Sequence, residues 1–188
     1  TFFLRLKKMS KNILVIKTSL RGNSNSDALA DAFVDGAQQA GNHVETISLK
    51  DKQIAFCKGC LACLKTGSCI IRDDAPAIVQ KMHDADVIVF ATPIYYYEMA
   101  GQMKTMLDRA NSLYGSDYAF GDIYLLSTAA EDAEGVDRRA ISGLEGWIDC
   151  FERARLAGTV FAGGVDAAGS IKGHPALKEA YEMGNKIQ

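Results

Sequence analysis

The sequence has no long apolar run, no strong charge of either sign and no low-complexity tract. No stretch approaches the about 20 consecutive apolar residues that a membrane-spanning helix requires. The 21 Lys and Arg residues nearly balance the 23 Asp and Glu residues. The formal net charge of -2 therefore gives no electrostatic reason to expect nucleic acid or an acidic membrane surface as a partner. No Pro/Gly/Ser-rich linker divides the 188 residues, so we expect one domain.

Histidine is scarce, and the common nucleotide-binding motifs are missing. The three histidines, His43, His83 and His174, show neither a metal-binding nor a Ser-His-Asp spacing. The G-x-G-x-x-G and G-K-[ST] motifs do not occur. The acidic pairs at 73–74 and 131–132 are interpreted as loop or helix-cap residues.

The first residues, "TFFLRLKK", do not have the pattern of an export signal. Arg5 interrupts the apolar piece, far short of the roughly 7–15 apolar residues of a secretory signal. Met9 followed by "SKNILVIK" resembles a natural start, so we expect residues 1–10 to be a tail left by the choice of start site and residues 11–188 to form the domain. The expected location is cytoplasmic and reducing, where structural disulfides are uncommon.

Apolar, β-branched runs alternate with segments of helical periodicity along the chain. This alternation is typical of a doubly wound α/β domain, in which helices cover both faces of a parallel sheet. In such sheets ligands bind outside the carboxyl ends of the strands. The expected strands are 12–18, 43–49, 86–92, 122–130 and 158–165, and the expected helices are 24–41, 76–83, 99–111, 136–155 and 174–187.

Two loops at that edge carry candidate binding groups. "TSLRGNSNS", residues 18–26, offers hydroxyls, amides and the Arg21 guanidinium just before a helix N-terminus, an arrangement that suits the monoester phosphate of FMN. The alternative is that Ser24 or Ser26 only caps the helix. "TPIYYYEM", residues 92–99, offers aromatic faces for a flat ring, or else an interface or core cluster.

The segments 13–26, 84–109 and 125–132 resemble the NADPH-dependent FMN reductase branch of the flavodoxin-like superfamily. The resemblance extends over almost the whole chain from Met9 and implies a five-stranded parallel sheet of order 2-1-3-4-5 with FMN held by three loops. The usual G-S-P-R start of the first loop is Thr18-Ser19-Leu20-Arg21 here, so the exact turn differs.

Carried over onto this sequence, the resemblance implies three sets of FMN-binding residues. The phosphate set is Ser19, Arg21, Asn23, Ser24, Asn25 and Ser26. The residues implied to border the isoalloxazine are Pro93, Ile94, Tyr95, Tyr96 and Met99. Those implied along the other edge of the ring are Thr128, Ala129 and Ala130.

Four of the five cysteines lie within "CKGCLACLKTGSC", at Cys57, Cys60, Cys63 and Cys69. Four thiolates suit a [4Fe–4S] cluster, and the spacing is similar to that of the iron–sulfur flavoproteins. Zinc, a redox-active thiol pair, or a plain loop of compact apolar thiols are the alternatives.

We expect FMN and no metal, with the four thiols free beside the flavin and Cys69 the one that points away. Cys150, alone on a helix near Trp147, is expected in the core.

The sequence thus predicts an FMN-dependent NAD(P)H oxidoreductase that reduces a quinone, nitroaromatic, flavin or similar acceptor by a ping-pong route, in which the flavin makes the bonds. The alternative is an iron–sulfur flavoprotein that carries electrons through FMN and a 4Fe–4S cluster. The tyrosine run 95–97, the methionines at 99, 103 and 106 and the cysteine loop predict an apolar surface, and with it a homodimer or tetramer with the flavin near the interface.

Overall fold

The sheet has five parallel strands in the order β2-β1-β3-β5-β6 in a computed structural model that describes residues 10–188. The expected tail lies almost entirely outside the described residues. The strands are β1 (Asn12–Lys17), β2 (His43–Ser48), β3 (Val87–Tyr95), β5 (Asp122–Thr128) and β6 (Arg155–Ala162). A short strand, β4 (Glu98–Met99), pairs antiparallel with the end of β3. Leaving β4 aside, the order is the predicted 2-1-3-4-5.

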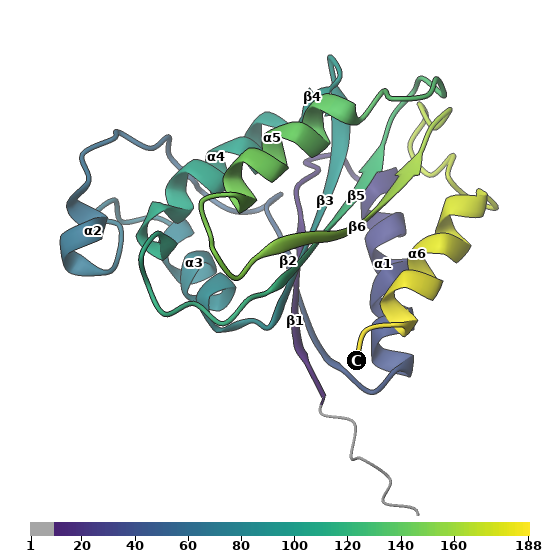
Figure 1. The fold of residues 1–188 in the computed structure, drawn as a ribbon. Helices are drawn as coiled ribbons and strands as arrows, with labels where there is room; N and C mark the ends of the chain where they lie inside the picture. Colours follow the sequence, from purple (N-terminus) through teal and green to yellow (C-terminus); the bar gives the residue numbers. More distant parts are fainter. Residues whose placement is uncertain (1–9) are drawn as a thin grey trace, which may run out of the picture.

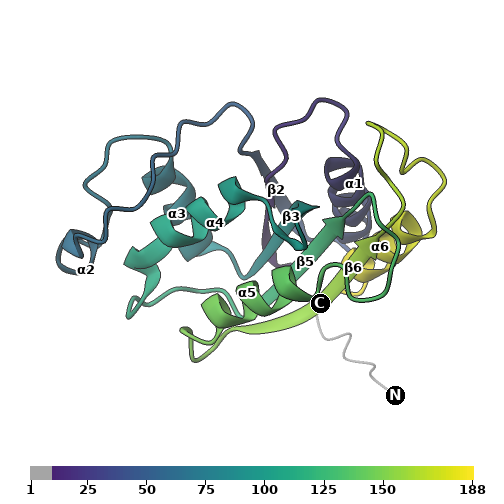
Figure 2. The ribbon, with the colours of Figure 1, turned by 90° about the horizontal axis from the view of Figure 1, so that it is seen from above.

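Helices cover both faces of this sheet, as Figures 1 and 2 show. On one face lie α1 (Asn25–Gln39) and α6 (Pro175–Asn185). On the other lie α3 (Ala75–Asp84), α4 (Gly101–Arg109) and α5 (Arg138–Ile148). Each layer buries its own apolar cluster against the sheet, because β-strand side chains alternate between the two faces. The doubly wound prediction is confirmed.

The two helices on the first face are in very close contact. A Cβ on Gly36 of α1 would lie 2.0 Å from the carbonyl oxygen of Tyr181 in α6. A Cβ on Gly184 of α6 would lie 2.2 Å from the carbonyl oxygen of Phe33. Glycine is therefore required on both helices where their backbones approach.

Several element boundaries differ from expectation. The helix expected over 99–111 begins with β4, continues as α4 and ends in a 3₁₀ turn, Ala110–Leu113. The helix expected over 136–155 is shorter, because α5 ends at Ile148 and the chain turns there to bury Phe151. Strand β6 begins earlier, at Arg155. A short helix, α2 (Ala62–Thr66), forms inside the cysteine loop.

Cys150 and the methionines are also placed differently. Cys150 follows the end of α5 and is exposed, not in the core. Met99, Met103 and Met106 are at most 5% exposed and belong to the core beneath α4, so the expected contribution of methionine to an apolar surface is wrong. Among the described residues, no helix is both long and apolar enough to cross a membrane.

Candidate functional site

The loop after β1 is held against the sheet by buried hydroxyls. Thr18 Oγ1 donates to the carbonyl oxygen of Ala91 at 2.9 Å, and Ser19 Oγ accepts from the backbone N–H of Arg21 at 3.2 Å. Gln102 Nε2 donates to the carbonyl oxygen of Thr18 at 2.6 Å, which joins the loop to α4. The loop therefore has a fixed course before α1 begins.

The N-terminus of α1 is capped by the predicted phosphate residues themselves. Ser24 is the N-cap, and its Oγ accepts from the backbone N–H of Asp27 at 3.4 Å and lies 3.0 Å from Ser26 Oγ. The capping alternative is therefore correct for Ser24, which lies where the first N–H groups of a 15-residue helix favour an anion. Burial raises the pKa of Asp27, and its Oδ1 has no hydrogen-bond partner.

Two predicted phosphate residues connect this loop to the segment after β6. Asn25 Nδ2 donates to the carbonyl oxygens of Val165 and Ala167, both at 2.9 Å, and Asn25 Oδ1 accepts from the N–H of Ile171 at 3.2 Å. Arg21 Nη1 donates to the carbonyl oxygen of Asp166 at 2.7 Å. The Asn25 side chain thus ties this loop to residues 165–171, whereas the Arg21 guanidinium is exposed and has further N–H donors.

Asn23 supports the same turn from the outside. It is exposed and has a left-handed backbone, with φ of 50°. Asparagine is one of the few residues that tolerate this conformation. The segment 163–174, which the loop contacts, was not predicted as part of the site. The partners lie about 140 positions apart in the chain, so no local pattern reveals them.

The aromatic loop is a tight hairpin between β3 and β4. Tyr96 and Tyr97 have φ of 51° and 66°, as a two-residue hairpin turn with left-handed positions requires. Tyr95, Tyr96 and Tyr97 are 51%, 97% and 46% exposed, whereas Pro93 and Ile94 are half-buried. The turn therefore presents its tyrosines to solvent at the carboxyl edge of the sheet.

The third loop, after β5, meets the hairpin. Tyr97 Oη donates to Glu131 Oε2 at 2.8 Å. Thr128 and Ala129 are buried, and Ala130 is exposed. The N–H of Ala129 donates to the carbonyl oxygen of Ala162, and the carbonyl oxygen of Ala129 accepts from the N–H of Val165. All three predicted loops thus lie at one edge of the sheet, which Figure 2 shows from above.

The donor groups fit FMN at this edge. Helix N–H groups, the hydroxyls of Ser19, Ser24 and Ser26 and the Arg21 guanidinium match a phosphate monoester, which accepts hydrogen bonds and carries negative charge. Met99 is the exception among the predicted flavin neighbours, because its side chain is buried in the core. It supports the hairpin from below.

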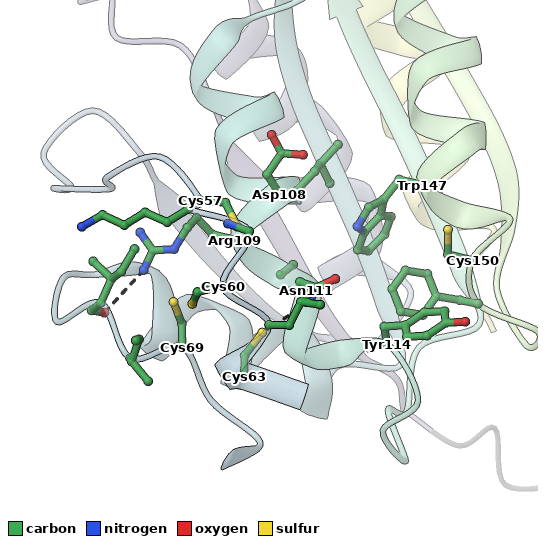
Figure 3. Close-up of a pocket in the computed structure, with 18 residues that line it drawn as sticks. Cys57, Cys60, Cys63, Cys69, Asp108, Arg109, Asn111, Tyr114, Trp147 and Cys150 are labelled. Carbon is green, nitrogen blue, oxygen red and sulfur yellow. Dashed lines mark hydrogen bonds between the residues drawn. The ribbon is translucent and has the colours of Figure 1, made fainter. Parts of the chain in front are cut away.

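The four loop cysteines line one pocket of about 450 Å³ at the far end of α4. Cys150 lies on the opposite wall with Trp147 and Tyr114, as Figure 3 shows. All five thiols are free. We call this space the cysteine pocket. Its lining contains Cys69 with the other three loop cysteines, so the expectation that Cys69 points away is wrong.

Within one chain the cysteine pocket and the predicted flavin loops lie at opposite ends of α4. Gly101 follows the hairpin, whereas Leu107 to Asn111 line the pocket. A rise of about 1.5 Å per residue makes this helix roughly 12 Å long. No residue of the predicted FMN set lines the pocket. Within a single chain, the four loop thiols therefore lie away from the three loops that are predicted to bind FMN.

A buried ion pair closes the base of the cysteine loop. The Arg109 side chain is fully buried and donates to both carboxylate oxygens of Asp73, at 2.5 and 2.8 Å. It also donates to the carbonyl oxygens of Ala55, at 2.7 Å, and Ile71, at 3.4 Å. Asp73 in turn accepts from the N–H groups of Ala55 and Ala75. We call this arrangement the Arg109 clamp.

The clamp was missed at the sequence level, where 73–74 were assigned to a loop or cap. Burial raises the pKa of the Asp73 carboxyl, but the hydrogen bonds from Arg109 and from the two N–H groups outweigh it and hold the pKa below its usual value. The hydrogen bonds to Asp73 raise the pKa of Arg109, and the nearby Cys69 thiol adds to the effect. Arg109 Nε is buried without a hydrogen-bond partner.

The thiols of the cysteine pocket are not grouped tightly. Asn111 Nδ2 donates to Cys63 Sγ at 3.3 Å, and the N–H of Gly59 donates to Cys57 Sγ at 3.4 Å. Over residues 10–188 no three His, Cys, Asp or Glu side chains are close enough to hold a single metal ion. The loop turns through three left-handed residues, Gly59, Leu61 and Gly67.

The sheet order and the loops at its carboxyl edge define a flavodoxin-like protein. The sequence profile of the NADPH-dependent FMN reductase family matches residues 11–140, and the chain belongs to this family.

Relatives with curated descriptions include iron–sulfur flavoproteins and a putative FMN-containing oxidoreductase. An iron–sulfur flavoprotein of Methanosarcina thermophila is 25% identical over 169 residues, covering 89% of this chain and 85% of that protein. A putative NAD(P)H-dependent FMN-containing oxidoreductase of Bacillus subtilis is 27% identical over 181 residues, covering 91% and 95%. An iron–sulfur flavoprotein of Archaeoglobus fulgidus is 40% identical over 82 residues, 44% of this chain, and this match spans only 40% of the length of that relative.

Solved structures share the fold at low sequence identity. An NAD(P)H:quinone oxidoreductase from Methanothermobacter marburgensis superimposes with a TM-score of 0.71 at 16% identity, covering 94% of this chain and 96% of that chain. An azoreductase from Bacillus anthracis gives a TM-score of 0.71 at 17% identity, covering 95% and 100%.

Proposed function

We propose that the protein is an FMN-dependent NAD(P)H oxidoreductase. The observation that carries the proposal is the convergence of a hydroxyl-rich helix N-terminus, an exposed tyrosine hairpin and the loop after β5 at one edge of a parallel sheet. That edge is where ligands bind in such sheets. Membership of the FMN reductase family supports the same assignment.

Each loop has a separate task in this proposal. Ser19, Ser24 and Ser26, with Arg21 and Asn23, hold the phosphate, and Asn25 fixes the loop from behind through its bonds to 165–171. Pro93, Ile94, Tyr95 and Tyr96 border the flavin ring on one side, with Thr128, Ala129 and Ala130 on the other.

When bound, FMN supplies the hydride chemistry. The protein's share is to orient the ring and to leave one face open to the nicotinamide. A quinone, nitroaromatic, flavin or similar acceptor then occupies the same open side after the nicotinamide has left, which is a ping-pong order.

Preference for FMN over riboflavin tests the phosphate assignment. Arg21→Ala removes one charge-assisted contact, so it should weaken FMN by about 1.5–3 kcal/mol and leave riboflavin unchanged. Arg72→Ala, which removes an exposed arginine outside these loops, is the matched control. Flavin fluorescence titration measures both, and NAD(P)H oxidation with a quinone present measures activity. Equal binding of riboflavin and FMN would show that the phosphate loop is wrongly assigned.

A second candidate function includes a [4Fe–4S] cluster that carries electrons. It is favoured by the observation that Cys57, Cys60, Cys63 and Cys69 line one pocket, and by the description of several relatives as iron–sulfur flavoproteins. Four thiolates are the donor set that such a cluster needs. Our expectation remains FMN and no metal in aerobically purified protein.

Anaerobic reconstitution with iron and sulfide, followed by metal analysis, separates the two candidates. Incorporation of about four irons per chain that is lost in Cys69→Ser establishes the cluster. Cys150→Ser is the matched control, because it removes a thiol from the opposite wall of the same pocket. If no iron is incorporated, or if the iron content is the same in Cys69→Ser as in the wild type, the cluster-free oxidoreductase is the remaining candidate.

The assembly and location remain proposals. The exposed Tyr95 to Tyr97 run and the exposed apolar residues of the cysteine loop, such as Phe56 at 80% and Leu61 at 58%, suit a homodimer or tetramer. Light scattering that gives the chain mass of 20.3 kDa would exclude this assembly. The proposed cytoplasmic location agrees with the five cysteines, which are all free.

A further inference from the structure

The two predicted walls of the flavin ring begin side by side in the sheet. Pro93 of β3 and Thr128 of β5 are the last pair in the parallel register of these strands, and the ladder between them ends there. The chain continues on one side as the hairpin to β4 and on the other as the loop after β5. Apart from the buried Met99, the remaining predicted ring residues are Ile94, Tyr95 and Tyr96 on the hairpin and Ala129 and Ala130 on the loop.

A hydrogen bond joins the two walls again beyond these residues. Tyr97 Oη donates to Glu131 Oε2 at 2.8 Å. Tyr97 and Glu131 each come directly after the ring residues of their own wall. Along both walls, these ring residues therefore lie between the Pro93–Thr128 pair and the Tyr97–Glu131 bond.

The helix α5 supports Tyr97 from a second side. Arg139 lies over the Tyr97 ring, with its Cζ 5.8 Å from the ring centroid, a distance at which a cation is attracted to an aromatic face. One turn further along α5, a Cβ on Gly143 would lie 3.2 Å from Met99 Cε, so the helix lies close against the hairpin (Figure 1). The hydrogen bond to Glu131 raises the pKa of Tyr97, because the ionised phenol could not donate it.

We propose that the Tyr97–Glu131 hydrogen bond sets the separation of the two walls, which makes both residues positioning residues for the isoalloxazine ring. The inference rests on the proposed function, since it concerns the same flavin site. Two segments that are already joined lose less conformational freedom when a ring binds between them. Neither residue belongs to the predicted FMN set, and neither has to touch the flavin in this role.

Flavin titration separates this role from phosphate binding. The full chain, freed of flavin, is titrated with riboflavin and with FMN, and the flavin fluorescence is followed. Tyr97→Phe removes the phenol and keeps the ring, so both flavins should bind about three- to tenfold more weakly, by the same factor. Arg21→Ala should weaken FMN alone. Tyr181→Phe, which removes the phenol of an exposed tyrosine on α6, is the control and should change neither affinity.

Glu131 is tested in the same way. Glu131→Ala should have the same effect as Tyr97→Phe, and the double variant should bind no more weakly than either single variant, because all three lose one bond. Glu131→Gln keeps a side-chain oxygen that accepts from Tyr97 and should retain most of the affinity. The flavin-free variants should unfold within roughly 4 °C of the wild type, because the bond is exposed.

The outcomes distinguish this inference from the proposed function. Flavin affinities that are unchanged or higher in Tyr97→Phe would overturn the inference, because the bond would then not hold the walls in the binding position. A loss confined to FMN would place Tyr97 at the phosphate, and additive losses in the double variant would show that the two residues act separately; both results contradict the inference. If Arg21→Ala weakens FMN while Tyr97→Phe changes neither flavin, the proposed function stands and only this inference fails. If the wild type binds neither flavin, both are wrong.

Discussion

Replacing Asp73 with alanine should be among the most destabilising substitutions of a polar residue in this protein. Asp73 has a side chain that is 10% exposed and accepts two hydrogen bonds from Arg109 and one each from the N–H groups of Ala55 and Ala75. Asp73→Ala leaves the buried Arg109 charge without a partner. Removing one member of a buried pair costs about 3–5 kcal/mol, mainly because the remaining charge stays desolvated.

Thermal unfolding measures this loss. A chain of this length loses about 2–4 °C of Tm per kcal/mol, so Tm should fall by roughly 6–20 °C. Asp108→Ala is the control, because it breaks an exposed ion pair with Lys104 and should cost no more than about 0.5 kcal/mol. The double variant Asp73→Ala/Arg109→Leu should recover much of the loss, since it removes the stranded charge.

The effect should also depend on pH. Because the folded-state pKa of Asp73 is depressed, its contribution is present above the unfolded value of 3.8 and is lost as the pH falls through the folded value. The difference between wild type and Asp73→Ala should therefore narrow in acid. If Asp73→Ala unfolds at the same temperature as Asp108→Ala, the clamp contributes no stability and the reasoning from burial is wrong.

Three further predictions concern other parts of the fold. Gly36→Ala should lower the free energy of unfolding in urea by about 1–3 kcal/mol, because its Cβ would meet the backbone of α6. Gly146→Ala, which has open space around it, is the control and should raise this free energy by up to about 1 kcal/mol. Similar urea midpoints for the two variants would contradict the close helix contact. His83 bonds Asp84 at 2.8 Å and Asp117 at 2.9 Å, and these bonds, that to Asp84 first, raise its pKa above 6.5. Its stabilisation should be complete below pH 6.5 and disappear as the pH rises through the folded pKa, so a His83→Ala deficit that grew with pH would refute it. Asp27→Asn should raise the urea midpoint at neutral pH and not in acid, because burial raises the pKa of this carboxyl; no gain at neutral pH would show that the buried charge is tolerated.

Local patterns predicted the sheet and the positions of the three loops, because strand and helix periodicities depend on nearby residues. They failed where a side chain's partner lies far along the chain. The bonds of the Asn25 side chain to residues 165–171 were not predicted, because these partners lie 140 or more positions away in the chain. Arg109 occupies an ordinary position in a helix, and only the fold brings it to Asp73, 36 residues away.

Cys150 shows a second kind of failure. The end of the helix was predicted too late, and the burial of Cys150 was therefore predicted wrongly. The helical pattern continued past residue 150, and Cys150 was expected in the core on that predicted helix. Instead α5 ends at Ile148, and Phe151 takes the buried place. In the aromatic cluster, Trp147 comes from the last turn of α5, Phe151 from the turn that follows this helix and Phe120 from the segment before β5.

The Arg109 clamp fixes both ends of the cysteine loop, so the loop is an insert that can vary separately from the sheet. The chain leaves the sheet layer near Ala55 and returns at Asp73, and both points are tied to one arginine. Between them, the loop makes none of the strand pairings of the sheet. We therefore expect substitutions or length changes within 57–69 to leave the sheet and its carboxyl edge in place.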